Sequence, residues 1–183
     1  MAKPKLRKML GDVNSPEVTK LMRLIETQSL KTLANWAIEY ARDNYLPIFE
    51  AESPGDGRPR AALNSCRAYL QGELPLNEAR KSINDATAAA REQALATAQA
   101  AARAIATACA VIRTPTSALG YLFYGAAAIA YSTAGTQRTP VEYDALAVQE
   151  LQRAYAALDH VAIPCLLYTS IRAAKADDSW HRI

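Results

Sequence analysis

Residues 86–110 have the sequence ATAAAREQALATAQAAARAIATACA, and no other segment says as much about the architecture. Fourteen of these twenty-five residues are alanine, and neither glycine nor proline interrupts the run. Alanine is the best helix former because it loses no side-chain entropy in a helix and has no β-branch to crowd the preceding turn. Its small side chain also lets neighbouring helices approach closely. The run therefore predicts the central helix of an all-helical domain.

The helical pattern extends beyond the alanine run in both directions. Small and apolar residues recur in steps of four and three from Ile83 to Ile112. We therefore predict one helix from Leu76 to Ile112, about 55 Å long at about 1.5 Å per residue. Asn84 and Asp85 compete for backbone hydrogen bonds, so a kink near them is an alternative.

Caps and prolines mark the other helices. Ser15-Pro16 and the capping box that begins at Thr139 each put proline at the first helical position, where its missing N–H costs nothing. Pro47 ends a helix near Tyr45. The expected helices begin at 16 and at 27 or 29, and span 59–70, 76–112, 115–133 and 140–159, with a loop at 52–58 and one short helix at most in the tail.

We therefore expect a single all-α domain over residues 1–183, a bundle of six or seven helices around the long alanine-rich helix. Its ends are an N-terminal arm over 1–14 and a C-terminal tail over 165–183, both flexible. Half of the 183 residues are hydrophobic, which allows a sizeable core without disulfides or metals. Three widely spaced cysteines and no signal-peptide pattern favour a cytoplasmic protein.

Several function classes are disfavoured. A net charge of +3 is too mild for a nucleic-acid-binding protein, and the most apolar window, 118–134, is short for a membrane span. His160 and His181 have no second ligand at metal spacing, and neither a phosphate-binding loop nor a nucleophile beside a base is evident. We expect no catalytic residue, metal or cofactor. Glu39 and Asp43 are interpreted as solvated or paired with Arg42.

The charged loop after the second predicted helix is the most promising binding feature. Asp56, Arg58 and Arg60 follow an aromatic helix end that includes Trp36, and arginine forks bind carboxylates. Alternatively, Arg58 and Arg60 pair with Asp56 and Glu50 or cap a helix. Along the long helix, Arg80 and Arg91 share a face and Arg103 drifts off it; ordinary solvent exposure is their alternative. The candidate partner- or ligand-binding residues are Trp36, Asp56, Arg58, Arg60, Arg80 and Arg91.

An ordered series of short motifs runs from Leu33 to Tyr131, over half of the chain. The series comprises Trp36-Ala37, Leu46-Pro47-Ile48-Phe49-Glu50, Asp56 with Arg58-Pro59-Arg60, Gly72-Glu73, Ala79-Arg80, Ala89-Ala90-Arg91 and Ala101-Ala102-Arg103. It resembles the Imm-5-like putative immunity proteins, a bacterial all-helical family associated with polymorphic toxin systems. The resemblance implies a cytoplasmic protein that binds and neutralises a cognate toxin and is not an enzyme.

The chain departs from the family pattern at one place. Histidines recur in the family in and just after the alanine-rich helix, where this chain has Cys109, Arg113, Thr116 and Ser117. If those histidines carry an activity or hold a metal, this member has lost it.

Two other functions stay open. A ligand-binding or enzymatic protein would have a pocket between the alanine-rich helix and the Tyr121–Tyr131 helix. A homo-oligomer would use the tyrosines of that helix as its interface, although Tyr121, Tyr124 and Tyr131 are more typical of a core.

Overall fold

The computed structural model describes residues 6–164, and these form eight helices and no strand. The all-α prediction is confirmed. Only Tyr45 separates the second helix from the third, so the two form one bent segment and the bundle has seven units, within the predicted range. The tail predicted at 165–183 lies outside the described residues. The helices are α1 (Pro16–Glu26), α2 (Leu30–Asn44), α3 (Leu46–Glu52), α4 (Arg58–Leu70), α5 (Leu76–Glu92), α6 (Ala96–Ala110), α7 (Ser117–Ala134) and α8 (Pro140–Val161).

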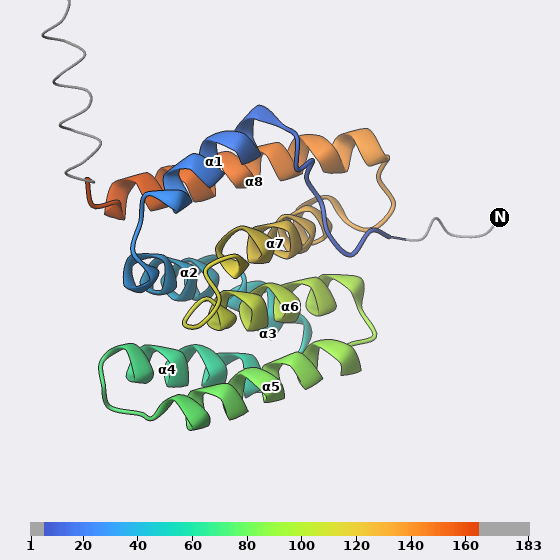
Figure 1. The fold of residues 1–183 in the computed structure, drawn as a ribbon. Helices are drawn as coiled ribbons and strands as arrows, with labels where there is room; N and C mark the ends of the chain where they lie inside the picture. Colours follow the sequence, from blue (N-terminus) through green and yellow to red (C-terminus); the bar gives the residue numbers. More distant parts are fainter. Residues whose placement is uncertain (1–5, 165–183) are drawn as a thin grey trace, which may run out of the picture.

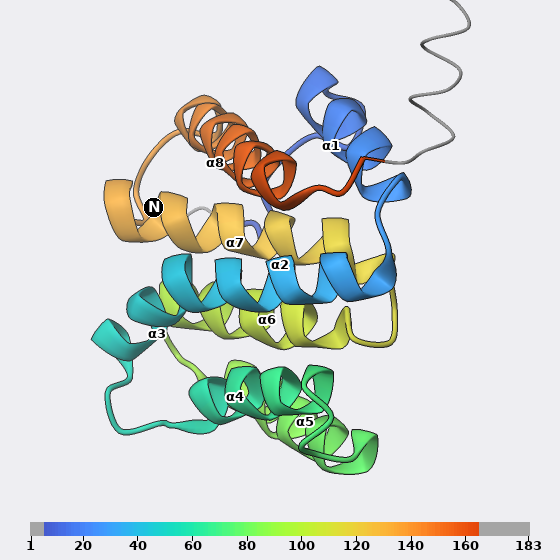
Figure 2. The same cartoon turned by 90° about the vertical axis from the view of Figure 1, so that its left-hand side faces the viewer.

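The helices are stacked in layers. In Figures 1 and 2, α1 and α8 cover one side of the molecule and α4 and α5 the opposite side, with α2, α6 and α7 between them. The alanine-rich α6 packs against α2, α3, α4, α5 and α7, so it is the central helix that the sequence predicts.

The prediction of one helix from Leu76 to Ile112 is wrong. Helix α5 ends at Glu92 and α6 begins at Ala96, because Gln93 and Leu95 have extended backbones with ψ of 128° and 130°. The chain reverses there, and α5 packs alongside α6 (Figure 1). Differences in helix propensity are below about 1 kcal/mol per residue, so packing outweighs them. A straight helix would leave part of its small-residue face without a neighbour.

Short side chains let the central helices pack closely. Ten residues of α6 are buried, seven of them alanines. Helix α7 contributes a further row of buried alanines, and its Tyr121 and Tyr131 are buried as well, as a core role predicts. The interface between α6 and α7 is thus filled by small side chains. Among residues 6–164, no helix has the length and hydropathy needed to cross a membrane.

Residues 6–14 of the expected N-terminal arm pack against α7 and α8. Leu10 is fully buried, and its N–H donates to the Phe123 carbonyl at 3.0 Å. Tyr131 donates its hydroxyl to the Arg7 carbonyl at 2.6 Å, and the Arg7 guanidinium pairs with Asp144. This part of the arm is therefore integrated into the bundle.

Candidate functional site

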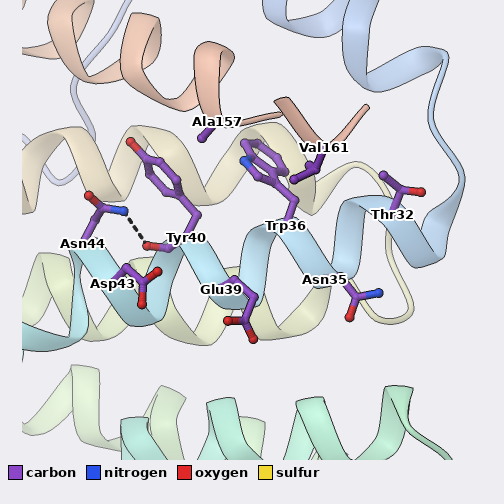
Figure 3. Close-up of a pocket in the computed structure, with 9 residues that line it drawn as sticks. All are labelled: Thr32, Asn35, Trp36, Glu39, Tyr40, Asp43, Asn44, Ala157 and Val161. Atoms are coloured by element: carbon purple, nitrogen blue, oxygen red, sulfur yellow. Dashed lines mark hydrogen bonds between the residues drawn. The ribbon is translucent and has the colours of Figure 1, made fainter. Parts of the chain in front are cut away.

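A groove of about 540 Å³ lies between α2 and the C-terminal end of α8. Figure 3 shows the rings of Trp36 and Tyr40 rising from α2 towards Ala157 and Val161. Aromatic side chains at helical spacing, with small residues opposite, leave this hollow at the surface. The groove is therefore mainly apolar on the α8 side.

Carboxylates form the other side of the groove. Glu39 and Asp43 are one turn apart on α2 and lie below the two rings in Figure 3. As predicted, Arg42 pairs with both, and Arg67 of α4 approaches Glu39 at 3.6 Å. The side chains of Glu39 and Asp43 are 39% and 62% exposed. Such solvated pairs contribute little energy, so an incoming cation can replace Arg42 at small cost.

Of the six site residues predicted from sequence, Trp36 alone is among the described residues that line this groove, and it is 5% exposed. Its ring contacts Tyr40 and Tyr121, with ring centroids 6.2 and 5.4 Å away. The indole Nε1 is buried and has no acceptor among the residues described. A buried donor without an acceptor costs about 1–3 kcal/mol.

Glu150 of α8 is fully buried and lies next to the aromatic side of the groove, where it contacts Tyr40. Tyr40 and Tyr45 both donate hydroxyl hydrogen bonds to Glu150 Oε1, at 3.0 and 2.7 Å, and Arg153 binds Oε2. Burial, followed by the negative charge of Glu150, raises the pKa of Tyr40 and Tyr45. The two phenols therefore remain protonated donors, and their two bonds fix α2 and the α2–α3 junction against α8, while Arg153 of the same helix pairs with Glu150.

Gly125 of α7 makes this arrangement sterically possible. A Cβ at this position would lie 2.1 Å from Tyr45 Cζ and 2.2 Å from its hydroxyl oxygen. Only glycine leaves room for the Tyr45 ring to cross α7 and reach Glu150.

The arginines of the charged loop pair with nearby carboxylates. Arg58 makes a bidentate pair with Asp56, with contacts of 2.9 and 2.7 Å, and also binds Glu92 at 2.6 Å. Arg60 makes a bidentate pair with Glu50, at 2.6 and 2.7 Å. Hydrogen bonding from Arg58 lowers the pKa of both Asp56 and Glu92. The geometry thus matches the interpretation in which Arg58 and Arg60 pair with Asp56 and Glu50. The further pair with Glu92 holds the loop against the end of α5.

A polar contact next to this loop joins the same two segments. The Ser53 hydroxyl donates to Gln93 Oε1 at 2.6 Å. The loop after α3 therefore secures the turn at which α5 reverses into α6.

The predicted arginines do not meet at one site. Ser65 of α4 and Ser82 of α5 are in contact at 3.0 Å, and Arg58 reaches Glu92, so these two helices run antiparallel. Arg80 thus lies at the opposite end of α5 from Arg58, about 16 Å from Arg91 along the helix axis. Arg91 and Arg103 line a separate groove between α5, α6 and α7.

Glu150 is the residue that the sequence analysis missed. Leu146, Glu150 and Ala154 recur every four residues along α8, so Glu150 falls on the inward stripe. A charged residue on such a stripe is the signal for a buried polar network. Its partners Tyr45 and Tyr40 are 105 and 110 positions away, so local sequence patterns do not identify them.

Comparison with known proteins identifies one similarity. The model of a family described as "Imm-5 like putative immunity protein" matches residues 23–158, well over half of the chain. The matched segment includes the charged loop, the residues of the groove between α5, α6 and α7, and those of the α2–α8 groove except Val161. Neither the search of curated proteins nor that of solved structures found a significant match.

Proposed function

The chain belongs to the Imm-5 like putative immunity protein family, and on that premise we propose that it neutralises a toxin protein by stoichiometric binding. The observation that carries this proposal is the family match over residues 23–158. Binding would occur in the bacterial cytoplasm and would need no catalysis by this chain. The groove between α2 and α8, with its aromatic and acidic side chains, supports the proposal.

We propose the groove between α2 and α8 as the toxin-binding surface. Aromatic residues in a hollow act as anchors in protein interfaces, and Trp36 and Tyr40 are already held rigidly by their ring contacts. The adjacent carboxylates of Glu39 and Asp43 complement a cationic side chain, which can also lie over an aromatic face. The groove therefore suits a lysine or arginine of the toxin.

The other residues predicted from sequence have a different role in this proposal. Asp56, Arg58 and Arg60 satisfy one another and nearby carboxylates, so they support the fold rather than meet the toxin. Arg80 and Arg91 lie on α5, in the layer opposite α8, and would remain outside the complex.

The test compares two double variants with the same change in net charge. Glu39→Gln/Asp43→Asn removes the acidic side of the groove, while Glu78→Gln/Asp85→Asn removes two exposed carboxylates of α5. The cognate toxin is co-expressed with each variant, and complex formation is followed by gel filtration and calorimetry. We expect the groove variant to raise the Kd at least tenfold, about 1.4 kcal/mol, and to reduce growth rescue.

The α5 variant should rescue growth as well as the natural sequence does. If both variants bind the toxin equally well, the interface lies elsewhere on the molecule. Failure of the unmodified protein to rescue growth or form a complex would reject toxin neutralisation itself.

A further inference from the structure

The second groove lies where α5, α6 and α7 meet, in a different layer from the α2–α8 groove. Its volume is about 340 Å³. Alanines of α5 and α6 form much of its surface, and their short side chains leave the hollow. Ile83 provides an apolar wall, and Tyr124 of α7 reaches it from the other side.

The two charged residues known to line this groove are both arginines, Arg91 and Arg103. Within residues 6–164, neither guanidinium has a carboxylate at ion-pair distance, whereas Arg58 and Arg60 do. Arg91 is exposed and Arg103 is half-buried. The groove therefore has positive charge that no described acidic residue offsets.

Neutral donors accompany the two arginines. Tyr124 is half-buried, and its hydroxyl has no hydrogen-bond partner in the described part of the chain. The Thr107 hydroxyl is likewise without a partner there, while Thr87 donates to the Ile83 carbonyl of its own helix. Two guanidiniums and two hydroxyls thus surround one cavity with no acceptor assigned to them.

The chain reversal at residues 93–95 creates this arrangement. Arg91 and Arg103 are twelve positions apart, so one continuous helix would separate them by about 18 Å along its axis. Because α5 folds back along α6, both residues line the same groove. The chain reversal, which contradicts the predicted continuous helix, therefore places both arginines at one groove.

We propose that this groove binds the anionic group, carboxylate or phosphate, of a small organic molecule. Arginine presents a planar fork of donors that matches either oxyanion, and a phenolic hydroxyl adds a further donor. Ligand pockets span about 300–1,000 Å³, so this cavity is at the small end and suits a ligand of few atoms. The proposal is independent of toxin binding, because it uses a different surface.

The experiment titrates the full-length protein with inorganic phosphate and, separately, with succinate by calorimetry at low ionic strength. We expect millimolar or tighter binding of at least one anion. Arg91→Gln/Arg103→Gln should weaken that binding at least tenfold. The matched control, Arg80→Gln/Arg113→Gln, removes the same net charge from exposed positions and should bind as the natural sequence does.

Tyr124→Phe provides a variant that leaves the charge unchanged, and we expect it to weaken binding severalfold. It also tests the site if the double arginine variant loses its helical circular dichroism. Binding of phosphate alone or succinate alone identifies the anion class. The proposal is overturned if neither anion binds at millimolar concentration, or if the control double variant loses affinity equally.

Discussion

Close packing at single residues positions the buried polar network. Gly125 and Tyr45 show this most directly, since a methyl group on Gly125 would overlap the Tyr45 ring. The ring must cross α7 at that point for its hydroxyl to reach Glu150. One missing side chain on α7 therefore permits a hydrogen bond between α8 and the junction of α2 and α3.

Gly125→Ala should destabilise the protein by about 1–3 kcal/mol, the usual cost of overpacking a tight core. The fully buried Tyr45 would have to shift, which also weakens its bond to Glu150. Urea unfolding followed by circular dichroism measures the change. Gly55→Ala is the matched control because a Cβ there meets nothing within 4 Å, and it should be nearly neutral. Equal stability of the two variants would contradict the packing argument.

At the level of elements, sequence predicts where helices begin better than where a helical run turns. Ser15 and Thr139 accept hydrogen bonds from Val18 and Glu142, as their cap patterns predict. The reversal at Gln93 has no such local signal, because alanine favours helix on both sides of it. The contacts that secure the reversal come from Ser53, directly after α3, and from Arg58 at the start of α4, 40 and 34 positions before their partners.

The Arg58 contacts make this reversal sensitive to acid. Hydrogen bonds from Arg58 lower the pKa of Asp56 and Glu92 in the folded protein, so their stabilisation is complete above about pH 5. It is lost as the pH falls through the lowered pKa values. Arg58→Met should therefore lower the urea midpoint at pH 7 and have progressively less effect below about pH 4.

The control for this titration is Arg80→Met, since Arg80 has no carboxylate partner within residues 6–164. Its effect on the urea midpoint should be small and independent of pH. A constant effect of Arg58→Met from neutral to acidic pH would show that the arginine acts by packing alone.

Across the whole molecule, contacts between distant parts of the sequence hold the outer layer in place. The segment before α1 packs against α7 through Leu10, and Arg7 reaches Asp144 of α8. Composition and charge suggested a flexible arm, because four of its first eight residues are basic and nothing local marks Leu10 as a core residue. Its burial depends on an apolar site that exists only when the bundle is assembled.

Leu10→Ala should cost about 2–5 kcal/mol, as for other large-to-small changes in a core. Met9→Ala changes an adjacent residue that is 41% exposed and should have little effect. Thermal unfolding of both variants checks the difference. If the two melt together, the N-terminal segment contributes no core packing.

The Glu150 network also has a consequence for the order of folding. Neighbouring helices such as α4 and α5 or α6 and α7 can pair early because short loops join them. The bonds from Tyr40 and Tyr45 to Glu150 close loops of 110 and 105 residues, so we expect them to form after the folding barrier. Interactions absent from the transition state chiefly slow unfolding. The network would therefore prolong the lifetime of the native protein and leave its rate of formation nearly unchanged.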